Sequence, residues 1–319
     1  MVGVNTIGLL VLMSLLTPTL ALADDGLALL HRIAQGTRQM TYSGTFVYRS
    51  GGKVDTSHIA HSLIDGIEME RIEALDGSPR EVLRVGGQVR CFFPEEQLLI
   101  IENRSSQRGF PALLPVGLGS LPDHYAIRSG GQGRVAGIKS RIVNLEPRDD
   151  LRYGHQFWMD ASSGLLLKAN MIGKRGETLE SFAFTQVKVG GPLEAEALKS
   201  RFDSERVRVQ QVHATEVKTD DIGWSFRTLL PGFHKIAAMR RQTAPENPES
   251  LHVVFSDGLA SISVFVETGG AMGEAESVTS VGPINVYRRQ LGEYRLVVMG
   301  EVPALAVKQL GGGIERRSK

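Results

Sequence analysis

The chain has 319 residues, with 36 Lys and Arg against 35 Asp and Glu, which gives a formal net charge of +1. A balance this close to neutral does not support a nucleic-acid-binding protein, which needs a concentrated basic surface. Hydrophobic residues make up 42% of the chain and charged residues 22%, as is typical of a folded globular protein. The single cysteine, Cys91, excludes an intrachain disulfide and a cysteine-rich metal site. The length indicates about two domains.

The N-terminal segment predicts export. Residues 1–23 carry no charged side chain and contain a mostly apolar run over residues 7–16. Pro18 and the triplet Ala21-Leu22-Ala23 follow, which is the order of a secretory signal with a cleavage site of the A-x-A type. An uncleaved membrane anchor is the alternative, because the segment lacks Lys and Arg, but the apolar run is short for a bilayer span. An exported chain without a cysteine pair fits the periplasm of a bacterium.

The residues after this signal predict one helix followed by a long run of strands. Leu27, Leu30 and Ile33 recur at helical spacing, which predicts a helix over residues 25–39. Over residues 42–189, short alternating segments are separated by Gly-Gly, Asp-Gly and Ser-Gly steps, which is typical of antiparallel hairpins. Ten or eleven strands are too many for a flat sheet, so the sheet is expected to curl towards a barrel.

A second, smaller domain is expected after a polar, neutral linker. Its clearest hairpin surrounds the Ser256-Asp257-Gly258 turn. Pro303 suits the first position of a helix over residues 304–310, which ends at Gly311. Residues 314–319 are expected to form a frayed tail. The expected limits are residues 24–190 for the first domain, 191–212 for the linker and 213–319 for the second domain.

The sequence contains no recognisable catalytic, metal-binding or cofactor-binding constellation. His58 and His61 are three residues apart, which places them on opposite faces of a strand and argues against joint metal ligation. Glu68, Glu70 and Glu73 are interpreted as a solvated strand face rather than as a catalytic carboxylate pair. A protein without enzymatic activity, cofactor or metal is therefore expected.

Aromatic side chains gather on one face of the predicted first sheet. The concave side of a curled sheet is a place where an apolar lining can hold an acyl chain, with the Gly- and Pro-rich apolar loop of residues 104–120 as a cap. The alternative, in which the leading helix and this loop fill the concave side as ordinary core, stays open. The cavity candidates are Phe46, Tyr48, Tyr153, Phe157, Phe182 and Phe184 from the strands, and Phe110, Leu113 and Leu114 from the loop.

Several segments, spread over nearly all of residues 24–319, carry a family resemblance. Residues 134–168 look like lipoprotein-carrier folds of the LolA/LolB type. More narrowly, the chain resembles the MucB/RseB family, periplasmic regulators of the envelope-stress sigma factor. The segments that carry this narrower resemblance are Tyr42 to Tyr48, Leu230-Pro231-Gly232-Phe233 followed by Arg240-Arg241, Phe255 to Val264, and Gly300 to Pro303.

The resemblance implies a mostly antiparallel α+β protein. It has a large, unclosed β-barrel domain of lipoprotein-carrier type and a smaller C-terminal antiparallel sheet domain with a helix. Members of this family are not enzymes. They bind the periplasmic region of a single-span anti-sigma factor, protect it from regulated proteolysis and so restrain the sigma factor. Release is triggered by an amphiphile, a lipoprotein acyl chain or lipopolysaccharide. A periplasmic lipid or lipoprotein carrier is the alternative function, and homo-oligomer formation is left open.

The candidates for contact with that protein partner lie in the second domain. They are Phe233, Arg240, Arg241, Arg288 and Arg289. Arginine pairs suit an acidic segment or anionic head groups, and a solvated surface is the alternative. The short terminal helix runs into Gly311-Gly312-Gly313, which are poor helix formers, so a partner surface on that helix is not favoured.

Overall fold

The computed structural model describes residues 21–103, 114, 118–202, 207–218, 222–242, 249–269 and 275–317. The expected signal segment therefore lies outside the described residues, except for its last three positions, where α1 (Ala21–Gln39) begins. No helix among the described residues is long and apolar enough to cross a membrane.

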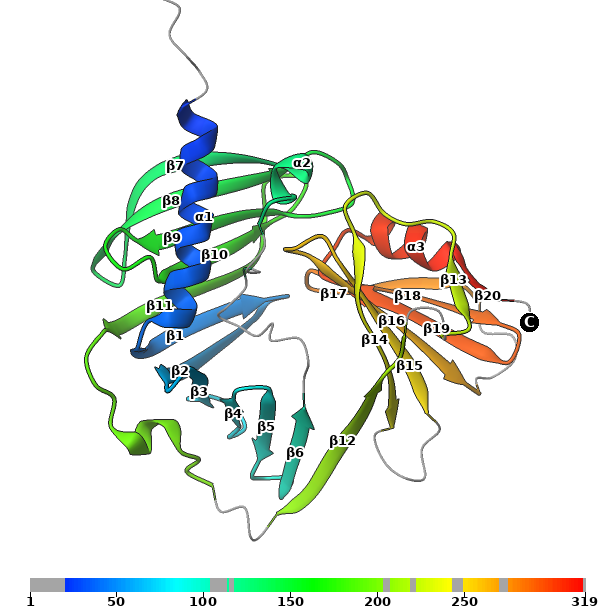
Figure 1. Ribbon diagram of the computed structural model, residues 1–319, viewed down its shortest axis with the longest axis horizontal. Helices are drawn as coiled ribbons and strands as arrows, with labels where there is room; N and C mark the ends of the chain where they lie inside the picture. Colours follow the sequence, from blue (N-terminus) through cyan, green and yellow to red (C-terminus); the bar gives the residue numbers. More distant parts are fainter. Residues whose placement is uncertain are drawn as a thin grey trace, which may run out of the picture.

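Eighteen strands form one continuous sheet that runs through both domains (Figure 1). Hydrogen-bonded neighbours follow the order β7-β8-β9-β10-β11-β1-β2-β3-β4-β5-β6-β12-β14-β15-β16-β19-β18-β17. All pairs are antiparallel except β6 with β12. The first eleven positions in this order are the strands of the N-terminal domain, as the sequence predicts.

The N-terminal domain is a strongly curled, open sheet with α1 across its concave side (Figure 1). Among the described residues no ladder joins β7 to β6, so the barrel is not closed. Its strands are β1 (Tyr42–Ser50), β2 (Lys53–Ile64), β3 (Ile67–Ala74), β4 (Glu81–Val85), β5 (Gln88–Phe93), β6 (Leu98–Asn103), β7 (Tyr125–Val135), β8 (Ile138–Pro147), β9 (Gly154–Asp160), β10 (Leu166–Ile172) and β11 (Thr178–Val189). A short helix, α2 (Leu121–His124), precedes β7.

The concave side of β7–β11 and β1 forms the core of this domain together with α1. The helix buries Leu29, Leu30 and Ile33, which are at most 2% exposed, in agreement with the helical spacing of the sequence. Glycine at position 44 permits the close approach of β1 and β11, because a Cβ atom there would clash with the backbone carbonyl oxygen of Gln186 in β11.

The expected linker differs most from prediction. A 3₁₀ helix, η1 (Ala195–Leu198), lies within the expected linker, and residues 208–212 already belong to strand β12 (Arg208–Glu216). This strand pairs parallel with β6 through residues 208–212 and antiparallel with β14 through residues 213–216. β12 therefore connects the strands of the two domains within the continuous sheet.

The C-terminal domain is an antiparallel sheet with α3 (Ala304–Gly312) packed on β18 and β19. The helix buries Ala306, Val307 and Leu310 in the core. The prediction of a frayed tail is wrong, because β20 (Ile314–Arg316) pairs with β13 (Trp224–Phe226). The remaining strands are β14 (His234–Gln242), β15 (Ser250–Ser256), β16 (Ser261–Thr268), β17 (Ser277–Val281), β18 (Ile284–Leu291) and β19 (Tyr294–Gly300).

Candidate functional site

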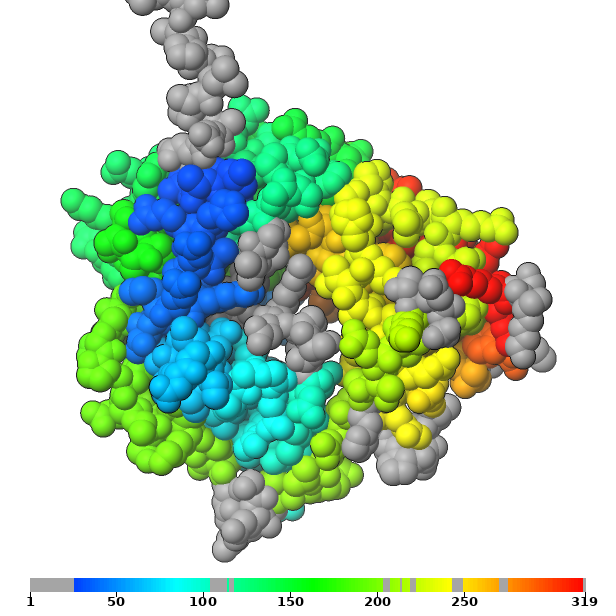
Figure 2. Space-filling model, in the orientation of Figure 1, coloured from blue at the N-terminus to red at the C-terminus, as the bar shows by residue number. Residues whose placement is uncertain are grey.

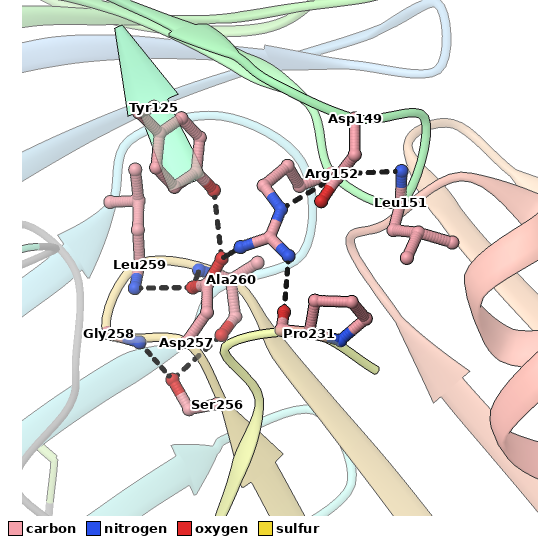
Figure 3. Close-up of polar contacts among 10 residues, drawn as sticks. All are labelled: Tyr125, Asp149, Leu151, Arg152, Pro231, Ser256, Asp257, Gly258, Leu259 and Ala260. Atoms are coloured by element: carbon pink, nitrogen blue, oxygen red, sulfur yellow. Dashed lines mark hydrogen bonds and ion pairs between the residues drawn. The ribbon is translucent and has the colours of Figure 1, made fainter. Parts of the chain in front are cut away.

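A buried arginine joins the two domains. Arg152, in the loop between β8 and β9, has no exposed side-chain surface and crosses the domain boundary (Figure 3). Its Nη1 donates a 2.6 Å hydrogen bond to Oδ2 of Asp257, and its Nη2 donates one of 2.6 Å to the carbonyl oxygen of Pro231. Its Nε donates to Asp149 of its own loop at 3.0 Å. We call the pair Arg152–Asp257 the clasp.

The clasp is held in place from both sides. Asp257 sits in the turn between β15 and β16, where its Oδ1 accepts hydrogen bonds from the amides of Leu259 and Ala260 at 2.9 and 2.8 Å (Figure 3). The hydroxyl of Tyr125 donates to Oδ2 at 3.1 Å. The guanidinium carbon of Arg152 also lies 5.6 Å from the ring centre of Tyr125. The carboxylate is thus fixed by its own turn and presents one oxygen to the other domain.

Apolar side chains are exchanged across the same boundary. Leu151 of the N-terminal domain is 8% exposed and belongs to the core of the C-terminal domain. Leu259 of the C-terminal domain packs in return against the core of the N-terminal domain. Gly232 has a φ of 76° and leaves no space for a Cβ atom, because His124 lies against it. The Leu230-Pro231-Gly232-Phe233 segment therefore permits close contact between the domains.

A crevice of about 750 Å³ lies between the domains next to the bridging strand. In Figure 2 the surface is hollowed between the cyan strands β5 and β6 and the yellow strands β14 and β15. Its apolar lining includes Val85, Ala214, Ala237, Met239 and Val254. Glu102 of β6 and Arg241 of β14 also line it and form an ion pair across it. We call this space the β12 crevice.

A second crevice, of about 610 Å³, lies between the β8–β9 loop, the β10–β11 turn and Pro303, which precedes α3. We call it the α3 crevice. Its lining is rich in charge and includes Asp149, Asp150, Lys174 and Glu177. Both crevices have a mainly apolar surface, and the α3 crevice differs in that acidic side chains outnumber basic ones in its lining.

His155 lines the α3 crevice and stacks on Phe157 with a centroid distance of 5.7 Å. Burial lowers the pKa of His155 to about 4, so the imidazole is neutral in the folded protein at neutral pH. The unfolded chain takes up this proton near pH 6.5. The contribution of His155 to stability is therefore complete above pH 6.5 and is lost as the pH falls towards 4.

We predict that this histidine makes the N-terminal domain less stable in acid. At pH 4.5 the free energy of unfolding should fall by about 2–3 kcal/mol more in the parent than in a His155→Phe variant, relative to pH 7.5. Urea unfolding followed by Trp158 fluorescence in a Trp224→Phe background measures this domain, because the chain has only these two tryptophans. The two variants may differ in stability at pH 7.5, but this difference must change as the pH falls to 4.5. pH profiles that stay parallel over this range would contradict the prediction.

Both domains match models of one known family. Residues 25–202 match the MucB/RseB N-terminal domain, and residues 218–315 match the MucB/RseB C-terminal domain. The chain belongs to the MucB/RseB family. The resemblance noted in the sequence is thereby confirmed over most of the chain.

Individual MucB and RseB proteins are similar over nearly their whole length. The sigma factor AlgU regulatory protein MucB of Pseudomonas aeruginosa is 34% identical over 306 residues, which are 92% of this chain and 92% of that protein. The sigma-E factor regulatory protein RseB of Haemophilus influenzae is 24% identical over 93% of this chain and 94% of that protein.

Solved structures of MucB are similar to this chain as well. The Pseudomonas aeruginosa MucA/MucB complex has a TM-score of 0.74 at 29% identity and covers 92% of this chain and 100% of that chain. A crystal structure of MucB has a TM-score of 0.66 at 28% identity and covers 92% of this chain and 98% of that chain.

In this MucB/RseB family member, most of the predicted cavity residues lie within the core. Phe46, Phe157, Phe182 and Phe184 are 4, 0, 2 and 3% exposed and share one cluster with α1. Tyr48 packs against the same cluster, and Leu114 is 2% exposed within it. Phe110 and Leu113 lie outside the described residues.

Tyr153 does not join this group. It precedes β9, lines the α3 crevice and accepts a 3.1 Å hydrogen bond from Nδ2 of Asn285 in the C-terminal domain. The sequence places it with Phe157 on one strand face, but the strand begins only at Gly154. Tyr153 is therefore a boundary residue.

The predicted partner-binding residues are not one patch. Phe233 is 3% exposed, and the centre of its ring lies 5.1 Å from the guanidinium carbon of Arg152. Arg241 lines the β12 crevice, while the neighbouring Arg240 points away from it and lies 3.6 Å from Glu249. Arg288 donates to Thr279, and Arg289 donates to the carbonyl oxygen of Ile314. Successive residues of a strand face opposite ways, so each arginine pair is divided.

Sequence reasoning did not assign a role to the clasp. Arg152 and Asp257 are 105 residues apart. In the sequence, Arg152 is recognisable only as part of the segment that resembles lipoprotein carriers, and Asp257 only as part of a hairpin turn. Glu102 was also missed, because its partner Arg241 comes from the other domain.

Proposed function

We propose that this chain is a periplasmic regulator that binds the periplasmic region of an anti-sigma factor. By covering that region it protects the anti-sigma factor from regulated proteolysis and restrains the envelope-stress sigma factor. The observation that carries this proposal is the similarity, over 92% of the chain, to a MucB whose structure is known in complex with MucA. The arrangement of both domains around shared crevices supports binding rather than catalysis.

The β12 crevice is the proposed place for the partner. It is bordered by both domains and is open to one face of the molecule (Figure 2). A volume of about 750 Å³ suits several side chains of an extended segment. Apolar side chains supply its walls, and the Glu102–Arg241 ion pair offers polar groups that can fix the orientation of a bound segment.

A bulky side chain in this crevice tests the proposal. We expect Ala214→Trp to weaken binding of the purified periplasmic fragment of the organism's own anti-sigma factor by about tenfold or more, because Ala214 is an exposed part of the wall. Lys174→Trp is the matched control, since it places the same ring in the α3 crevice. Calorimetry measures both. If both variants bind the fragment as tightly as the parent does, the partner binds elsewhere. If only Lys174→Trp weakens binding, the α3 crevice is the favoured site.

Release by an amphiphile belongs to the same proposal. An acyl chain that enters the N-terminal domain would have to displace α1, Leu114 or Leu118, since the phenylalanines on the concave face are packed against them in one cluster. Such a movement would change the packing of Leu259, which belongs to the C-terminal domain and contacts this core. The displacement would thereby reach the domain boundary. The affinity of the chain for lipopolysaccharide, measured with and without the anti-sigma fragment, tests this coupling, because linkage requires each ligand to weaken the other equally.

A further inference from the structure

The two domains are attached at β12 in a way that permits rotation. Residues 208–212 of this strand pair only with β6, and residues 213–216 pair only with β14. The change of partner falls between Val212 and His213. Rotation about the backbone at this point therefore breaks no ladder hydrogen bond, because each half of β12 moves with its own domain.

Among the described residues, the clasp is the most deeply buried ion pair between the two domains. Arg152 and Asp257 are both fully buried, and each belongs to a different domain. A buried charge that loses its partner is costly, and inside one domain only unfolding would return it to water. Here separation of the domains is enough to expose both groups. The clasp can therefore open without loss of either fold.

A third contact lies on another part of the boundary. The β1–β2 turn meets the β17–β18 turn, where a Cβ atom on Gly51 would lie 3.2 Å from the Cα of Gly282. The Glu102–Arg241 ion pair also joins the domains, but its two side chains are 14 and 21% exposed, whereas those of the clasp are fully buried.

We propose that the domains open and close as rigid bodies about the Val212–His213 junction, that the Arg152–Asp257 clasp holds them closed, and that opening releases a segment bound in the β12 crevice. This regulation rests on the proposed function, since it concerns the same crevice. The walls of the crevice come from β5, β6, β12, β14 and β15, so a change of domain angle separates them.

The first test breaks the clasp. Asp257→Asn keeps an oxygen for the amides of Leu259 and Ala260 but removes the charge that Arg152 needs. Arg152→Met breaks the same contact from the other domain. Glu267→Gln is the matched control, because it removes an Arg–Glu pair within the C-terminal domain. All variants carry Cys91→Ser, and spin labels at Arg175→Cys and Glu293→Cys report the distance between the domains.

Both clasp variants are expected to gain a second distance population and to bind the anti-sigma fragment about tenfold more weakly or worse. Circular dichroism spectra should match that of the parent, and Glu267→Gln should change neither the distances nor the affinity. An unchanged distance distribution in both clasp variants would overturn the proposal. So would a second population that binds the fragment as tightly as the parent does.

The second test locks the domains together. In a Cys91→Ser chain, Gly51→Cys with Gly282→Cys places two thiols next to each other across the boundary. Both positions have a positive φ, so circular dichroism of the reduced chain checks that the fold tolerates the cysteines. The oxidised chain should release the anti-sigma fragment about fivefold more slowly or worse than the same chain after reduction. Equal release rates before and after reduction would overturn the proposal. If the parent does not bind the fragment at all, the proposed function fails, while the label distances still measure the domain motion.

Discussion

Replacement of Phe157 by alanine is expected to lower the free energy of unfolding of the N-terminal domain by about 3–5 kcal/mol. Phe157 lies in β9 with no exposed surface, in the cluster that α1 covers. Removal of its ring deletes a large buried apolar surface and leaves a space that neighbouring strands, tied by ladders on both sides, cannot collapse to fill.

This substitution distinguishes a packed core from an open cavity. In a cavity that holds an acyl chain, the alanine variant would lose little stability and would bind the amphiphile differently. Urea unfolding followed by Trp158 fluorescence in the Trp224→Phe background measures the loss. Val54→Ala is the control, because this side chain is 54% exposed and its truncation should cost about 0.5 kcal/mol or less. A loss below about 1 kcal/mol for Phe157→Ala would favour the cavity.

Local patterns in the sequence were enough to predict most of the elements. The spacing of Leu30 and Ile33 indicates the face that α1 buries, and glycine-containing turns separate most of the eleven strands of the N-terminal domain. These signals are local because a helix or a hairpin is formed by residues close in sequence. The exchange of pairing partners along β12 was not predictable, because it depends on strands that lie far away in the sequence.

Buried charges were the other feature that the sequence did not reveal. Glu70 lies between Met69 and Arg71 in β3, in a segment rich in charge, yet it is 2% exposed. Arg84 on the neighbouring strand donates a 2.8 Å hydrogen bond to it, so the partner that permits burial comes from 14 residues further on. The interpretation of Glu68, Glu70 and Glu73 as a solvated face is therefore wrong for Glu70. The clasp is hidden for the same reason over a longer separation.

Replacement of Arg71 by alanine is expected to have a comparably large effect on the opposite side of the sheet. Arg71 is 2% exposed, and its Nε donates a 2.6 Å hydrogen bond to Glu81, which has no exposed surface. Its Nη2 donates to Glu73 at 2.7 Å. The Arg71→Ala chain keeps a buried carboxylate at Glu81 whose nearest remaining donor is the amide of Arg201 at 3.3 Å. The free energy of unfolding should fall by about 3–5 kcal/mol.

The same change should loosen the segment that leads to the second domain. Arg201 also donates from its side chain to Glu73 at 3.1 Å, and Phe202 packs near Phe92 on this face. Amide hydrogen exchange over residues 195–202 should therefore rise in Arg71→Ala at a urea concentration where the domain is still folded. Exchange that rises equally in all strands of the domain would indicate global destabilisation instead.

A double variant separates the charge from the packing. Arg71→Met with Glu81→Leu removes both ions and keeps apolar volume at the two sites, and such replacements of buried pairs are often neutral or stabilising. We expect it to recover most of the stability that Arg71→Ala loses. It should not restore slow exchange over residues 195–202, because the carboxylate that accepts from the amide of Arg201 is gone. Recovery of both properties would mean that packing alone holds this segment on the sheet, and that the ion pair contributes nothing specific to the path of the chain between the domains.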